Sequence, residues 1–132
     1  MKVRVLSWNI NSVRLRIDSL LSIIKEYRPN VVCIQETKCP NDQYPYEEFH
    51  KVGLKNVHSN GIKGYHGVSI ATNLDVKKVE QKNFCEKRDG RHLALTLNTN
   101  NKPITIHNFY VPAGGDAVSY THLTLPTTRC GY

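Results

Sequence analysis

The sequence lacks a long hydrophobic run. Near the N-terminus, where a signal peptide would carry an apolar core of about 7 to 15 residues, the chain is interrupted by Arg4, Ser7 and Asn9. The longest apolar stretch elsewhere runs only from Val31 to Ile34, far short of the roughly 20 residues of a membrane-spanning helix. We therefore expect a cytoplasmic protein that is neither secreted through a signal peptide nor inserted in a membrane.

Paired cysteine motifs are also missing. The four cysteines stand at positions 33, 39, 85 and 130, and no two of them have the C-x-x-C spacing. Neither a zinc ribbon nor a disulfide framework is therefore indicated. We expect reduced thiols, as is usual in a cytosol.

Acidic residues are few relative to basic ones. The chain has 18 Lys and Arg residues against 11 Asp and Glu residues, a formal net charge of +7. Such a balance favours an anionic partner, with nucleic acid first, although many ordinary soluble proteins are equally basic. The length of 132 residues predicts one domain.

The first third of the chain has the pattern of a strand, a helix and a second strand. "KVRVL" alternates polar and apolar residues as strands do, and "NVVCIQE" is a short, largely apolar strand. Between them, one helical face is formed by Ile17, Leu20, Leu21, Ile24 and Tyr27. Pro29 would end this helix and Ser12 is its expected cap. In such a βαβ unit both strands end at the same edge, so Asn9 and Glu36 should lie side by side.

The rest of the chain predicts one short helix and several strands. "YEEFHKVG" is expected to form a helix closed by Gly53. Residues 54–59 and 67–73 are expected as strands around the glycine-rich turn "NGIKGYHG". After the charged loop 80–90, residues 91–99 and 102–111 have the pattern of two strands joined as a hairpin.

The last 16 residues differ in kind from the rest. "AVSYTHLTLPTTRCGY", residues 117–132, has no acidic residue and no clear periodicity. It resembles peptides produced when sequencing-adaptor DNA is read as coding sequence. We therefore predict a domain over residues 1–116 and an artefactual tail over residues 117–132.

A carboxylate and an amide at neighbouring strand ends suit a hard cation. Mg²⁺ takes oxygen ligands and keeps several waters, so Glu36 is a candidate ligand with Asn9 beside it. A different interpretation from the residues alone is that Asn9 and Asn11 are turn or cap residues and Glu36 is a solvated strand end. The spacing leaves both interpretations open.

Four ordered stretches carry a resemblance to a known family. "SWNINSVR", "PNVVCIQETK", "GIKGYHGVSI" and "HNFYVPAGGD" resemble motifs of the exonuclease III family, in the same order and at similar separations, across residues 1–116. The resemblance implies an α/β fold, the N-terminal half of a four-layer sandwich in which two packed β-sheets are flanked by helices. It also implies a Mg²⁺-dependent DNA repair nuclease, in which Mn²⁺ could replace Mg²⁺. Its substrate would be double-stranded DNA with abasic sites or 3′ ends, and no membrane or obligate protein partner is inferred.

The resemblance also implies roles for single residues. Glu36 becomes the metal ligand, Asn9 its catalytic and metal-binding neighbour, and Tyr110 the phenol near the scissile phosphate, where a hydroxyl can donate a hydrogen bond. Asn108 matches the family pattern in support of the site. The expected substrate-binding group consists of Asn108, Lys63, Tyr65, His66, Arg88 and Arg91, of which the last five also suit a plain surface turn or a solvated loop.

Several family motifs are missing from the 132 residues. A Gly-Asp-x-Asn segment and a Ser-Asp-His segment, which would supply the general base and further contacts, are not present. Because a lost general base costs about 10² to 10⁴ in rate, we expect this chain alone to be inactive. We also expect it to hold roughly the first sheet and its helix, with one apolar sheet face bare and a poorly soluble or partly folded product as the result.

Two other functions remain open from the sequence. The chain could be a non-catalytic nucleic-acid-binding module that uses its basic surface. It could also belong to a phosphatase of the same superfamily, since such enzymes share the broader fold and a similar asparagine and glutamate pair.

Overall fold

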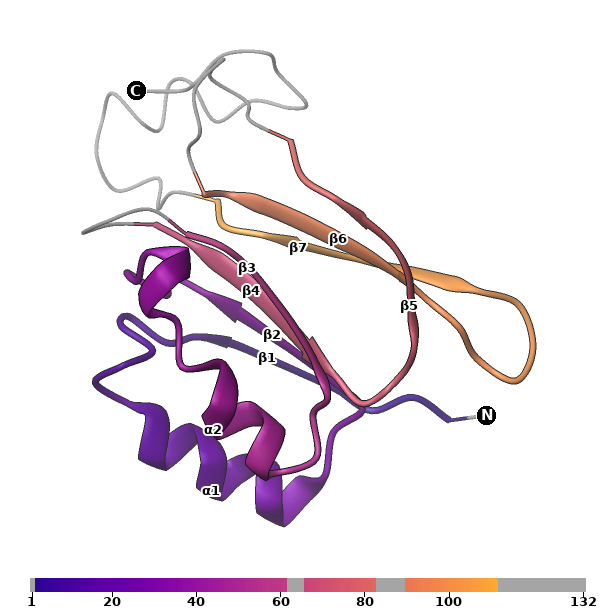
Figure 1. Cartoon of the computed structure of the whole chain (residues 1–132), viewed down its shortest axis with the longest axis horizontal. Helices are drawn as coiled ribbons and strands as arrows, with labels where there is room; N and C mark the ends of the chain where they lie inside the picture. Colours follow the sequence, from indigo (N-terminus) through magenta and orange to yellow (C-terminus); the bar gives the residue numbers. More distant parts are fainter. Residues whose placement is uncertain (1, 62–65, 83–89, 112–132) are drawn as a thin grey trace.

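The protein folds as two packed β-sheets with helices on one outer face (Figure 1). The computed structural model describes residues 2–61, 66–82 and 90–111. Sheet A has the strand order β1-β2-β4-β3, and sheet B has the order β5-β6-β7. The elements in chain order are β1 (Val5–Asn9), α1 (Ile17–Tyr27), β2 (Val31–Gln35), the 3₁₀ turn η1 (Asn41–Gln43), α2 (Tyr46–Lys51), β3 (Asn56–Asn60), β4 (Val68–Thr72), β5 (Val76–Glu80), β6 (His92–Leu97) and β7 (Ile104–Phe109).

The expected βαβ unit is present. Strands β1 and β2 pair in parallel, with Val5 opposite Val31 and Asn9 opposite Gln35. The first strand lies later than the "KVRVL" pattern indicated, because it extends through Trp8 and Asn9. Both strands therefore end at the same edge of sheet A.

Helix α1 packs its apolar face on sheet A. Leu20 and Ile24 are buried on that face, as the spacing predicted. The helix ends at Arg28, whose left-handed backbone lets its amide donate to the Ile24 carbonyl. The expected Ser12 cap is wrong: the helix begins at Ile17, and the Ser12 hydroxyl instead accepts from the amide of Leu15, 3.4 Å away, in the preceding turn.

Sheet B corrects an expectation from the sequence. The hairpin β6-β7 does not extend sheet A but joins β5 in a separate sheet. Strand β5 was not expected from the sequence, because its residues do not alternate between apolar and polar. In the structure most of them are exposed.

The inner face of sheet A is covered, so the expected bare face is wrong. The core between the two sheets combines residues of β2 and β4 with residues of β6, namely Val31, Cys33, Val68, Ile70, Leu93, Leu95 and Leu97. A second core lies between sheet A and the helices and includes Leu20, Ile24, Ile34, Phe49 and Leu54. The premise for a partly folded product therefore does not hold for the described residues.

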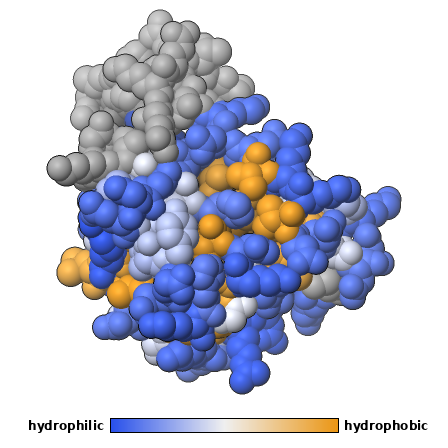
Figure 2. Space-filling view, in the orientation of Figure 1, coloured by the Kyte–Doolittle hydropathy of each residue, from blue (hydrophilic) through white to orange (hydrophobic). Residues whose placement is uncertain are grey.

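Hydrophilic residues cover most of the face seen in Figure 2, with apolar residues in smaller areas among them. Within the described ranges, no helix is long and apolar enough to cross a membrane.

Candidate active site

The parallel pairing of β1 and β2 places Asn9 and Glu36 at one edge of sheet A. Beyond the strands, the amide of Ile10 donates to the Gln35 carbonyl at 3.0 Å, and the amide of Ser12 donates to the Glu36 carbonyl at 2.9 Å. The two chain segments thus stay side by side past the strand ends. Asn9 is exposed and Glu36 is half-buried, so both side chains lie where a solvent-borne ligand can reach the edge.

The backbone turns sharply at Glu36. Its φ is 53°, and that of Lys38 is 50°, both in the left-handed region that costs a residue with a side chain about 1 kcal/mol or more. The turn is held by hydrogen bonds from the amides of Thr37 and Lys38 to the carbonyls of Gly67 and His66, at 3.0 and 2.9 Å. The loop before β4 therefore fixes the direction of the chain at the candidate metal ligand.

Tyr110 brings sheet B to the same edge. It follows β7, and its amide donates to the Arg91 carbonyl at 2.9 Å. Its ring lies beside that of His66, with centroids 5.2 Å apart. Burial raises the pKa of the Tyr110 phenol, and the nearby Glu36 carboxylate raises it further, while the Arg91 guanidinium acts in the opposite direction. Tyr110 is thus a neutral hydroxyl donor at neutral pH, within electrostatic range of Glu36.

Asn108 joins the two sheets beneath this edge. Its side chain is 2% exposed. The Nδ2 group donates to the carbonyls of Ile34 and Ser69, at 3.0 and 2.8 Å, and Oδ1 accepts from Gln35 Nε2 at 2.7 Å. Because both N–H donors are used by protein groups, the geometry favours the supporting role over a direct substrate contact.

The other predicted substrate-binding residues divide into two groups. His66 is half-buried beside Tyr110, and Arg91 is only 7% exposed and acts electrostatically on Tyr110. These two join the site. Lys63, Tyr65 and Arg88 lie outside the described residues.

The donor set partly fits a magnesium ion. Among the described residues, no three His, Cys, Asp or Glu side chains come together as a metal cluster. Mg²⁺ is commonly held by one or two carboxylates and keeps several waters, so Glu36 with the Asn9 amide suffices for part of its coordination. The Glu36 carboxylate makes no ion pair or hydrogen bond with any other described residue, so its oxygens are available to such an ion.

Gln35 is a site residue that the sequence did not reveal. Its Nε2 donates to Ser7 Oγ at 3.1 Å as well as to Asn108 Oδ1. The one feature of the sequence that points to Gln35 is its position directly before Glu36 at the end of the strand. The partner on β7 is 73 residues away in sequence, so only the packing of the sheets shows the contact.

A comparison with protein families shows the family of this chain. The endonuclease/exonuclease/phosphatase family matches residues 6–127. The chain belongs to that family. The predicted boundary after residue 116 stays a prediction, since residues 112–132 lie outside the described part.

The relatives that this chain matches include an exodeoxyribonuclease III and a recombination repair protein. Exodeoxyribonuclease III of Haemophilus influenzae is 32% identical over 114 residues, which cover 85% of this chain and 42% of that protein. Recombination repair protein 1 of Drosophila melanogaster is 32% identical over 115 residues, covering 86% of this chain and 16% of that protein. This chain thus spans less than half the length of these relatives.

A solved structure confirms the fold. An AP endonuclease from Archaeoglobus fulgidus superposes with a TM-score of 0.75 at 31% identity, over 84% of this chain and 42% of that one. The expected resemblance to the exonuclease III family and the α/β sandwich are therefore both confirmed.

Proposed function

We propose that this chain supplies the metal-binding and phosphate-binding edge of a DNA nuclease. The reaction would be Mg²⁺-dependent hydrolysis of phosphodiester bonds at abasic sites and 3′ ends of double-stranded DNA. The observation that carries the proposal is the meeting of Glu36, Asn9 and Tyr110 at one edge of the packed sheets. The names of the relatives, an exodeoxyribonuclease and an AP endonuclease, support the choice of DNA as substrate.

Glu36 and Asn9 would hold the metal ion. When bound there, Mg²⁺ would polarise a phosphoryl oxygen and offset the charge that develops on it. The hydrogen bonds that hold the turn at Glu36 fix where the carboxylate stands before substrate arrives. Such preorganisation is what an electrostatic site requires.

Tyr110 would donate a hydrogen bond to a phosphate oxygen. Burial and the Glu36 carboxylate raise the pKa of its phenol, so the proton stays on the oxygen at neutral pH. The Arg91 guanidinium adds positive charge beside the same phenol. A phosphate placed between them would meet a neutral donor and a cation, which together suit an oxyanion.

The general base is not supplied by any recognised motif of these 132 residues. The Gly-Asp-x-Asn and Ser-Asp-His segments of the exonuclease III family are missing from the sequence. We therefore propose that the chain alone is a poor catalyst, because the lack of a general base lowers the rate by about 10² to 10⁴. It needs the remaining part of the fold for full activity.

The test is a chimaera. Residues 2–116 of this chain replace the matched 42% of Haemophilus influenzae exodeoxyribonuclease III, and the product is assayed on a duplex with one abasic site. We expect Mg²⁺-dependent incision that chelation abolishes, and Glu36→Gln should lower the rate about 10² to 10³-fold because the carboxylate ligand is lost. Glu47→Gln, an exposed carboxylate on α2, is the matched control and should leave the rate unchanged.

The same chimaera separates the competing functions. Hydrolysis of inositol phosphates without incision of DNA would favour a phosphatase. Binding of DNA with no hydrolysis of either substrate would favour a non-catalytic module. Incision that persists in the Glu36→Gln variant would reject the proposed metal ligand.

A further inference from the structure

The turn that carries Glu36 needs support from its surroundings. Glu36 and Lys38 both have a left-handed backbone, with φ of 53° and 50°, which residues with side chains rarely adopt. Such a conformation persists where neighbouring groups fix the chain from several directions. The direction of the Glu36 carboxylate therefore depends on the groups that hold this turn.

Three successive residues of the loop after β1 hold three successive carbonyls of the turn 36–38. The backbone amides of Ser12 and Val13 donate to the first two carbonyls, at 2.9 and 3.0 Å. Arg14 continues the row with its side chain, because its Nη2 donates to the Lys38 carbonyl at 3.2 Å. The arginine thus takes the place that a third backbone amide would have.

The guanidinium of Arg14 is itself held in place. Its Nη1 donates to Gln43 Oε1 at 2.6 Å, and Gln43 belongs to η1, the next turn along the chain. A planar guanidinium can make both bonds at once, which an ammonium cannot. Arg14 is exposed and follows Val13, which is fully buried. Its side chain can therefore be replaced without a cavity in the core.

We propose that Arg14 is a positioning residue of the metal site: it holds the Lys38 carbonyl and so fixes the turn that directs the Glu36 carboxylate. The inference rests on the proposed function, in which Glu36 binds the metal ion. The charge of Arg14 acts the other way, because a guanidinium near the turn repels a divalent cation. Geometry and charge therefore predict opposite changes in metal affinity when Arg14 is replaced.

The test is a titration of the whole, isotopically labelled chain with Mn²⁺, followed through its backbone amide signals. Arg14→Met should weaken Mn²⁺ binding about tenfold, although the loss of a positive charge alone would strengthen it. Arg14→Lys keeps the charge but loses the fork, so it should also weaken binding. Gln43→Ala leaves the net charge unchanged and should act in the same direction by a smaller factor.

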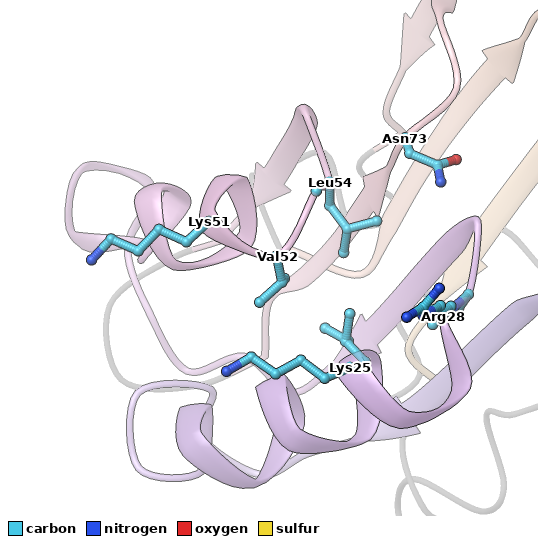
Figure 3. A pocket seen from close by; sticks show the side chains of 9 residues that line it. Lys25, Arg28, Lys51, Val52, Leu54 and Asn73 are labelled. Carbon is cyan, nitrogen blue, oxygen red and sulfur yellow. The ribbon is translucent and has the colours of Figure 1, made fainter.

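Two control variants lie at the other end of sheet A. Arg4, just before β1, is an exposed arginine whose Nη1 donates to the Tyr27 carbonyl at 2.9 Å, so Arg4→Met removes the same kind of hydrogen bond. Lys25 lines a pocket between the ends of α1 and α2 (Figure 3), so Lys25→Met removes only a charge. Both variants should leave the Mn²⁺ affinity nearly unchanged.

Hydrogen exchange tests the turn without any metal. In Arg14→Met, the amide of Lys38 should exchange with deuterium about tenfold faster, because the turn opens more often. The amide of Arg28, which donates to the Ile24 carbonyl at the end of α1, should exchange at its original rate. Equal exchange of the Lys38 amide in the variant and the natural chain would show that Arg14 does not hold the turn.

The chimaera described above gives a third measurement. Arg14→Met should raise the Mg²⁺ concentration that gives half the maximal rate, while excess Mg²⁺ restores most of that rate. The inference is overturned if Arg14→Met binds Mn²⁺ as tightly as the natural chain or more tightly, if Arg4→Met weakens binding equally, or if only the KM for DNA rises, as a direct phosphate contact would cause. If the natural chain binds no Mn²⁺, the proposed function fails, and the exchange of the Lys38 amide still decides whether Arg14 holds the turn.

Discussion

At the scale of single residues, Asn108 links the two sheets beneath the candidate site. Its amide is buried on β7 and hydrogen-bonds to Gln35, Ile34 and Ser69 of sheet A. Tyr110 lies two residues further along the chain. Loss of the Asn108 amide would therefore make the position of the Tyr110 phenol relative to Glu36 less fixed.

Replacing Asn108 by leucine should be strongly destabilising. It removes the three side-chain hydrogen bonds that Asn108 makes with the Ile34 carbonyl, the Ser69 carbonyl and the Gln35 amide. We expect a loss of about 2 to 4 kcal/mol in the free energy of unfolding. Urea denaturation measures it. Thr105→Val on the same strand is the matched control, since the Thr96–Thr105 hydrogen bond is exposed, and it should cost less than about 1 kcal/mol. Equal losses in the two variants would show that Asn108 does not join the sheets.

Cys33 provides a test of the packing between the sheets. It is 5% exposed, and burial raises the pKa of its thiol from 9.0 to about 11. Above pH 9 the thiol ionises in the unfolded chain before it does so in the folded protein, so the stability that is present below pH 9 is lost as pH rises toward 11. We expect the stability of the natural chain to fall by roughly 2 kcal/mol more than that of Cys33→Ala across this range. Denaturation curves at several pH values measure the difference, and parallel pH profiles would place the thiol in contact with water.

The sequence indicated the exposed members of the site better than the buried ones. Asn9 and Glu36 could be paired because parallel strands end at the same edge, which follows from local pattern alone. Gln35 and the contact between Asn108 and sheet A could not be predicted, since they depend on how two sheets distant in sequence pack together.

At the scale of elements, the turn after β2 depends on the loop before β4. Gly67 has φ +95°, and a Cβ there would clash with Thr37 Oγ1, next to Glu36. The loop can therefore approach the Glu36 turn only because residue 67 has no side chain.

Substituting alanine for Gly53 and for Gly67 separates the cost of backbone strain from the cost of a steric clash. Gly53 has a similar φ of +92°, but nothing lies within 4 Å of an added Cβ. We expect Gly53→Ala to cost about 1 kcal/mol from backbone strain and Gly67→Ala to cost more than about 3 kcal/mol from strain and clash together. Thermal unfolding measures both. A similar loss of stability in the two variants would mean that the turn at Glu36 shifts at little cost to make room for the added Cβ.

The elements themselves were predictable where apolar residues repeat. Helix α1 and strands β2 and β4 followed from their periodicity. Strand β5 did not, because its "VKKVE" sequence is mostly exposed. The start of α1 was also missed, since the Ser12 hydroxyl stabilises the turn before the helix instead of the helix itself.

At the scale of the whole molecule, the described residues already form two sheets with a core between them. The sequence predicted the sandwich but placed only one sheet in this chain. Nothing local in residues 91–111 distinguishes a hairpin that extends sheet A from one that packs across it. Packing on sheet A places β7 so that Tyr110 reaches the edge where Glu36 lies.

The proposed metal site can be measured directly by adding Mn²⁺, a paramagnetic substitute for Mg²⁺, to isotopically labelled chain and recording backbone amide signals. Selective broadening should appear around Asn9, Glu36 and Tyr110, vanish in Glu36→Gln, and persist in Glu47→Gln. Broadening centred elsewhere, or unchanged in Glu36→Gln, would contradict a metal ion held at this edge and with it the proposed nuclease chemistry.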